Sequence, residues 1–197
     1  MSSPPEPPII IAGGGPVGVI AALALARQGL SVHVFEAESE VNDAPRAATT
    51  HAATLEMLEK LGLVDEVIRR GLVEPLFRIW DQSTGKLVAE FDFGNLKNDT
   101  RYPFAVQCEQ HKLANLAIER LRAFPHATVE FSARVTSISQ SSDAVEIAVE
   151  TAGGIRTVKG SYLIGADGGR STVRTGETRC EYNPRASTQK SLQSPCH

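Results

Sequence analysis

The chain has 197 residues, of which 42% are hydrophobic and 22% are charged, and its formal net charge is −3. These values are typical of a globular protein of ordinary domain size that buries a core, and they argue against nucleic acid or an anionic membrane as the main partner. The three cysteines lack C-x-x-C spacing, so we expect free thiols, a cytoplasmic location and no metal site.

The first elements lie in an uncharged run, residues 9–26. A membrane-spanning helix needs about 20 apolar residues, but four glycines and a proline interrupt this run. Its β-branched start predicts a buried strand, "GGGPVG" predicts a turn, and residues 16–29 predict a helix that ends at Gly29. Residues 31–37 alternate like a second strand, so the pattern indicates a βαβ unit and argues against a membrane anchor.

The turn matches G-x-G-x-x-G through Gly13, Gly15 and Gly18. The first glycine permits a tight turn, the second lets the backbone approach a pyrophosphate, and the third lets the helix pack close to the strand. Glu36 follows Gly18 by eighteen residues, where a carboxylate accepts hydrogen bonds from an adenosine ribose. That carboxylate would repel a 2′-phosphate, so the pattern favours a dinucleotide without one.

The rest of the chain predicts helices and short strands. Helical periodicity predicts helices over 52–61, 64–70 and 109–124. Two alternating runs separated by turn residues predict a β-hairpin over 76–93. Strands are expected at 104–107, 127–131 and 162–166, with a three-stranded meander over 133–160. Residues 94–103 are expected to be a polar loop.

The dipeptide Asp167-Gly168 follows the last predicted strand. Asp-Gly is a common turn sequence, but ligands of open α/β sheets bind beside the carboxyl ends of the strands. We therefore interpret Asp167 as a binding residue. After Arg174 the sequence becomes mostly polar without strand or helix periodicity, so residues 175–197 are expected to be disordered.

Several motifs occur together: "GGGPVG" with Glu36, "PRAATTHAATLEMLEKLGL", "CEQHKLANL", "ARVTSI" and "YLIGADGGRSTVR". Over roughly residues 8–174 they resemble the N-terminal part of the FAD-dependent aromatic-ring hydroxylases, the single-component flavoprotein monooxygenases that include para-hydroxybenzoate, phenol and hydroxyphenylpropionate hydroxylases. The resemblance implies an α/β fold: a Rossmann-like FAD-binding domain with a three-stranded β-meander insertion and a partial β-rich substrate subdomain. It also implies FAD as cofactor, NADH or NADPH as electron donor, and O₂ and a small phenolic substrate as reactants.

The resemblance implies cofactor-binding roles for the positions that match the family, and it names no catalytic side chain. The implied cofactor contacts are Gly13, Gly15, Pro16 and Val17 at the pyrophosphate, Glu36 at the adenosine ribose, Arg46 at the flavin-side phosphates, Gln110 (with Gln107 as the weaker candidate) near the ribityl chain, Val135 at the adenine through its backbone, and Asp167 at the ribityl region. Arg170 and Arg174 are implied near the path of the nicotinamide cofactor.

The family continues with a second FAD motif, Gly-Asp at the end of a strand, which this sequence does not show after Arg174. We therefore expect a truncated member with the following divisions: a flexible N-terminus (1–7), the FAD-binding βαβ unit and helices (8–71), a partial substrate-side β segment (72–107), the remainder of the FAD-binding domain (108–174) and a disordered aberrant tail (175–197). A homodimer is left open.

Three functions remain open on these residues. The first is an FAD-dependent monooxygenase, impaired if this chain acts alone. The second is a non-catalytic FAD-binding or nucleotide-binding remnant of such an enzyme. The third is an NAD-dependent oxidoreductase with a lone Rossmann fold, against which "GADGGRSTVR" and Arg46 argue.

Overall fold

The computed structural model describes residues 6–44, 48–169 and 171–175. Its centre is a four-stranded parallel sheet in the order β12-β1-β2-β8. These strands are β1 (Ile9–Ala12), β2 (Val32–Phe35), β8 (Ala127–Glu130) and β12 (Tyr162–Gly165). Their last residues are level with one another in the register, so all four carboxyl ends form one edge of the sheet.

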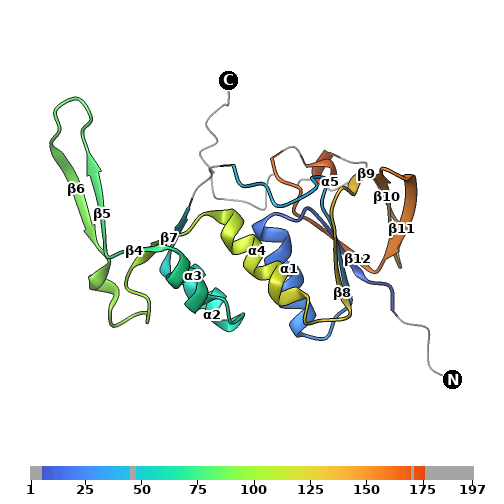
Figure 1. Cartoon of the computed structure of the whole chain (residues 1–197), viewed down its shortest axis with the longest axis horizontal. Coiled ribbons are helices and arrows are strands. Elements are labelled where there is room, and N and C mark those ends of the chain that lie inside the picture. The colour runs from blue at the N-terminus through green and yellow to red at the C-terminus, as the bar shows by residue number, and fades with distance from the viewer. Residues whose placement is uncertain (1–5, 45–47, 170, 176–197) are drawn as a thin grey trace.

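Two helices, α1 (Pro16–Arg27) and α4 (Gln110–Leu121), cover one face of this sheet (Figure 1). The helices α2 (Ala52–Lys60) and α3 (Val64–Arg70) lie beyond them, on the side away from the sheet. The uncharged run thus forms a four-residue strand and most of a 12-residue helix that packs against the sheet. Within the described residues, no helix has both the length and the apolar character needed to cross a membrane.

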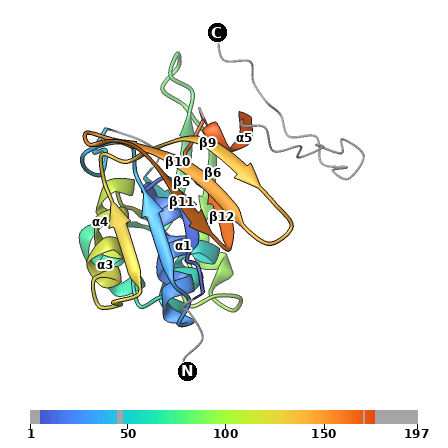
Figure 2. The ribbon, with the colours of Figure 1, turned by 90° about the vertical axis from the view of Figure 1, so that its right-hand side faces the viewer.

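An antiparallel meander covers the opposite face, as Figure 2 shows. It consists of β9 (Arg134–Gln140), β10 (Val145–Thr151) and β11 (Gly154–Gly160), in the order β11-β10-β9. The alternation of the central strands explains the two layers. Ile11 faces the helices, whereas Ile10 and Ala12 pack against the meander.

The remaining strands lie on the other side of the helices (Figure 1). A small sheet has the order β3-β7-β4, formed by β3 (Thr49–Thr50), β7 (Ala105–Gln107) and β4 (Leu72–Glu74). Beyond it the hairpin of β5 (Leu76–Trp80) and β6 (Leu87–Asp92) extends away from the rest of the molecule, followed by the 3₁₀ helix η1 (Phe93–Leu96). The last described element is α5 (Thr172–Thr175).

The predicted α/β fold with its meander is confirmed, and each predicted helix and strand is present with its ends no more than three residues from the expected bounds. Two features differ. The start of the expected polar loop forms η1, and the two-residue and three-residue strands β3 and β4 were not predicted. Such short strands carry too few residues to show a period of two. The predicted strand over 127–131, which no pattern assigned to a sheet, is β8 of the parallel sheet. Residues 1–5 and 176–197, including most of the predicted tail, lie outside the described residues.

Candidate functional site

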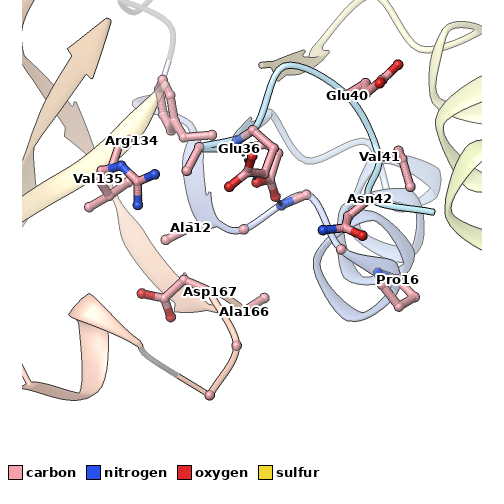
Figure 3. Close-up of a pocket in the computed structure, with 18 of the residues that line it drawn as sticks. Ala12, Pro16, Glu36, Glu40, Val41, Asn42, Arg134, Val135, Ala166 and Asp167 are labelled. Atoms are coloured by element: carbon pink, nitrogen blue, oxygen red, sulfur yellow. Dashed lines mark hydrogen bonds between the residues drawn. The ribbon is translucent and has the colours of Figure 1, made fainter. Parts of the chain in front are cut away.

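A cavity of about 340 Å³ lies at the carboxyl edge of the parallel sheet (Figure 3). Five separate segments line it: the glycine turn after β1, the loop after β2, the start of α4, the start of β9 and the turn after β12. These segments are far apart in the sequence. The parallel register brings them together because it places the ends of β1, β2 and β12 side by side.

The glycine turn shows why its residues are glycines. Gly13 has a φ of +105°, and a Cβ there would collide with the carbonyl oxygen of Ala166. A Cβ on Gly18 would collide with the carbonyl oxygen of Gly13, so this glycine lets α1 start close to the turn. By contrast, a Cβ on Gly15 would meet no atom within 4 Å. Gly15 therefore faces open space at the N-terminus of α1, where free N–H groups favour an anion.

Glu36 connects the loop after β2 to the glycine turn. Its Oε2 accepts a hydrogen bond from the Gly14 N–H at 2.5 Å, and its Oε1 accepts one from the Glu38 N–H at 2.9 Å. A Cβ on Gly14 would lie 2.8 Å from the Glu36 Cβ, so the two residues pack too closely for a larger side chain. The carboxylate lines the cavity and has lone pairs left for hydroxyl groups.

Asp167 forms the wall beside β12. Its Oδ2 accepts hydrogen bonds from the Thr172 N–H at 2.6 Å and the Val173 N–H at 3.1 Å. Burial favours the neutral carboxyl, but hydrogen bonds from the Ser171 hydroxyl and these backbone groups outweigh it, so the pKa of Asp167 lies below its usual value. Its Oδ1 is buried without a hydrogen-bond partner among the described residues. A buried charged oxygen without a partner is costly and indicates a missing donor.

The structure brings most of the predicted cofactor residues together. Those that line the cavity are Gly13, Gly15, Pro16, Glu36, Gln110, Val135 and Asp167. Val17 does not line it: its side chain is 71% exposed and faces a second cavity. Arg174 is also absent from the lining, and its Nη2 donates to the Gly169 carbonyl at 2.5 Å. Arg46 and Arg170 lie outside the described residues.

The structure separates the two glutamine candidates. The Gln107 side chain donates to Glu74 Oε2 at 2.6 Å and accepts from the Thr49 hydroxyl at 3.0 Å, which ties β7 to both of its neighbouring strands. Gln110 begins α4 and lines the cavity. Its position therefore supports the predicted preference for Gln110.

Gln110 and Pro16 also line the second cavity, which is largely apolar and has a volume of about 700 Å³. This cavity lies between α1, α2 and β3, and its wall includes Ala48, Thr49 and Leu113. The two cavities therefore meet at Pro16 and Gln110. A cavity with a helix N-terminus and carboxylates thus lies beside a largely apolar one.

Sequence reasoning missed some residues of the first cavity, among them Gly14, Asn42 and Arg134. The run of three glycines was the available signal for Gly14. Arg134 directly precedes Val135, the predicted adenine contact, but an exposed arginine at the start of a strand is normally a surface residue. Asn42 lies in a loop without a motif. These residues reach the cavity through contacts between segments that are distant in the sequence, which a local pattern does not show.

The residues present fit FAD. Gly15 leaves open space at a helix N-terminus for a diphosphate, and Glu36 and the unpaired Oδ1 of Asp167 supply acceptors for hydroxyl groups on either side. Within the described residues, no group of three or more His, Cys, Asp or Glu side chains is placed to hold a metal ion.

Comparison with known proteins identifies an FAD-binding family and relatives that are monooxygenases. Residues 6–181 match the family model described as an FAD binding domain. The chain is 39% identical over 168 residues to 6-hydroxy-3-succinoylpyridine 3-monooxygenase HspB of Pseudomonas putida, an alignment that covers 84% of this chain and 42% of that protein. It is 33% identical to para-nitrophenol 4-monooxygenase of Pseudomonas sp. strain WBC-3, covering 84% and 41%. The chain thus spans about two fifths of these relatives.

The solved structures similar to this chain include monooxygenases as well. The crystal structure of p-nitrophenol 4-monooxygenase PnpA from Pseudomonas putida DLL-E4 superposes with a TM-score of 0.82 at 32% identity, over 86% of this chain and 42% of that chain. The flavin-dependent monooxygenase PieE, solved in complex with FAD and substrate, superposes with a TM-score of 0.77 at 26% identity, over 88% and 32%. The fold around the cavity is therefore one that holds FAD in a relative.

Proposed function

This chain belongs to the FAD-binding-domain family of the aromatic-compound monooxygenases, and from that premise we propose that it forms the cofactor-binding part of an NAD(P)H-dependent monooxygenase that hydroxylates small phenolic substrates. Bound FAD would supply the electron transfer and the reaction with O₂ that side chains cannot perform. The chain's own residues bind this cofactor, orient it and exclude water from it.

The observation that carries the proposal is the Asp167 carboxylate. Its Oδ2 is held by two backbone N–H groups of α5, whereas its buried Oδ1 lacks a partner in the described part of the chain. A hydroxyl donor from a ligand in the adjacent cavity would satisfy that oxygen. The ribityl chain of FAD carries hydroxyl groups, and a simple NAD site offers no reason for an acidic residue at this position.

The other residues follow in order along the cavity. The glycine turn and the N-terminus of α1 would hold the diphosphate, and Glu36 would accept hydrogen bonds from the adenosine ribose. Gln110 lies where the polar and apolar cavities meet, so we place the ribityl chain there and the flavin ring at the mouth of the apolar cavity. We also propose that Arg46 contacts the flavin-side phosphates.

We propose the same division of the chain that the sequence predicts, and the cavity supports part of it. Its lining residues fall within 12–16, 35–44, 110–111, 134–135 and 166–169 and at 172, and the described residues of 72–107 contribute none. This supports the assignment of 8–71 and 108–174 to cofactor binding and of 72–107 to the substrate side. NADH or NADPH as donor, with Arg170 and Arg174 near its path, a cytoplasmic location and a homodimer remain parts of the proposal that await their own measurements.

The first experiment is to purify the 197-residue protein and measure bound flavin by absorbance and by FAD released on denaturation. We expect bound FAD, and we expect Asp167→Ala to lose it while Arg122→Ala, at the exposed end of α4, keeps it. NADH or NADPH oxidation that rises with para-nitrophenol would support the monooxygenase. Flavin binding without such oxidation would favour a non-catalytic FAD-binding protein, and NAD binding without flavin would contradict the proposal.

A further inference from the structure

The side chain of Arg134 projects into the first cavity, as Figure 3 shows, and its guanidinium has no hydrogen bond or ion pair to any residue that the structure describes. By contrast, the Arg156 guanidinium of β11, in the same meander, pairs with both carboxylate oxygens of Glu130. An exposed guanidinium that remains unpaired while it lines a cavity is available to a ligand.

Backbone contacts fix Arg134 beside the ribose end of the cavity. The Ala133 N–H donates to the carbonyl oxygen of Glu36 at 2.8 Å, and the Ser132 N–H donates to the carbonyl oxygen of Glu38 at 2.8 Å. Ser132 has a φ of +53°, a left-handed conformation that turns the chain from β8 into β9. Arg134 follows immediately, so the backbone places its Cα beside Glu36, and its side chain starts from there.

The position of Arg134 points to a base and away from the phosphates. The strands end in the order Asp167, Gly13, Glu36 along the sheet, and β8, whose chain leads into Arg134, lies beyond β2. The diphosphate position, at Gly15 and the start of α1, is on the other side of Glu36. A planar guanidinium stacks well on an aromatic face, and a purine ring offers such a face.

We propose that Arg134 stacks on the adenine ring of the bound dinucleotide and so selects an adenine-containing flavin over a flavin mononucleotide. This inference rests on the proposed function, because it assigns a binding role within the same site. Adenine would lie between the Arg134 guanidinium and the part of the cavity wall that Glu36 and Val135 form.

The test compares the wild type with Arg134→Ala, Arg134→Lys, Arg134→Trp and the charge-matched control Arg122→Ala. Calorimetric titrations use FAD, ADP, FMN and inorganic pyrophosphate. Loss of a base-stacking contact weakens binding by about tenfold, so we expect that loss for FAD and ADP with Arg134→Ala. Arg134→Lys should lose nearly as much, and Arg134→Trp should restore binding. FMN and pyrophosphate affinities should not change, and Arg122→Ala should behave as the wild type.

Two results would overturn the inference alone. One is wild-type FAD affinity in Arg134→Ala. The other is full rescue by lysine with none by tryptophan, together with weaker pyrophosphate binding, because this would show a phosphate contact. A wild-type protein that binds ADP with the expected dependence on Arg134 but retains no FAD would contradict the proposed function and leave the adenine contact intact. A wild type that binds neither ligand would overturn both.

Discussion

The cofactor cavity and the β5–β6 hairpin differ in how their apolar residues are covered. Around the cavity, Ile10, Ile11 and Val34 are 0% exposed, because helices pack on one face of the sheet and the meander on the other. In the hairpin, Phe77 is 46% and Phe91 53% exposed. Each strand of the hairpin pairs only with the other in the described part of the chain.

This comparison separates two requirements of the protein. The cavity depends on a core that the described residues complete among themselves, so changes there should alter both folding and binding. A two-stranded hairpin is marginally stable by itself, and the apolar side chains of this one can gain burial only from contacts outside the described residues. Changes in the hairpin should therefore leave the cofactor cavity intact.

The largest effect should come from Gly18→Val. The new side chain would overlap the Gly13 carbonyl oxygen at the base of the turn, and we expect the free energy of unfolding to fall by about 3 kcal/mol from overpacking. Urea denaturation monitored by circular dichroism measures this. The matched variant Gly15→Ala meets no atom within 4 Å, so it should stay folded but bind FAD more weakly. An unchanged urea midpoint in Gly18→Val would show that the turn is not part of the folding core.

A smaller effect should follow Asp167→Asn, which removes the charge that accepts from the N–H groups of Thr172 and Val173. We expect a loss of about 1–2 kcal/mol, because the two N–H groups exchange a charged acceptor for a neutral one, together with weaker FAD binding. Because the folded-state pKa of Asp167 is lowered, its contribution is full at neutral pH and is lost as pH falls through that pKa.

The pH dependence gives this prediction its control. Urea unfolding at pH 7 and below about pH 4 brackets the ordinary titration range of an aspartate. The difference between wild type and Asp167→Asn should shrink at the lower pH, whereas Asp43→Asn, an exposed loop residue, should match the wild type at both. A difference that stays constant with pH would contradict a stabilising charge at Asp167.

The next effect concerns the attachment of the meander to the parallel sheet. Arg156 of β11 donates to both carboxylate oxygens of Glu130, at 2.6 and 2.7 Å, and lies 5.7 Å from the centre of the Phe35 ring. His33 stacks on the same ring at 4.0 Å and hydrogen-bonds Glu130. Because these ion pairs are partly exposed, we expect Arg156→Ala to cost about 0.5–1 kcal/mol, measured by thermal or urea unfolding.

Acid should weaken this cluster in two steps. Burial is the main cause of the lowered pKa of His33, so the neutral ring is favoured and stability falls as pH drops below its ordinary value. The Arg156 hydrogen bond is the main cause of the lowered pKa of Glu130. The stability that this carboxylate contributes is therefore lost in a second step, as the pH falls further, through the folded-state pKa of Glu130. A cost of Arg156→Ala that grows on acidification would contradict this assignment.

The smallest effect on stability and binding should come from the hairpin. Replacing both Phe77 and Phe91 with threonine puts residues that favour strands in their place and removes the exposed ring pair. Exposed substitutions usually change stability by less than about 0.5 kcal/mol, and we expect unchanged FAD affinity and less self-association in sedimentation experiments. A tenfold loss of FAD affinity would show that the hairpin supports the cavity, against the comparison drawn above.

Much of the fold follows from local sequence patterns. The β-branched strand, glycine turn and helix of residues 9–29 carry their signals within a few residues, because strand and helix periods and glycine turns are local properties. The positions of Gly13, Glu36 and Asp167 at one edge also follow, because each comes directly after a parallel strand. The sequence alone thus determined the βαβ unit, the glycine turn and the acidic residues beside the turn.

The tertiary structure alone decided how distant segments meet. The backbone hydrogen bond from Ala133 to Glu36 places Arg134 at the cavity, although Arg134 lies 98 positions after Glu36 in the sequence. Contacts of β7 with its neighbouring strands occupy Gln107 and leave Gln110 at the cavity, and the direction of α1 turns Val17 away from it. No local period encodes these choices, because each depends on hydrogen bonds and packing between segments that only the completed fold brings together.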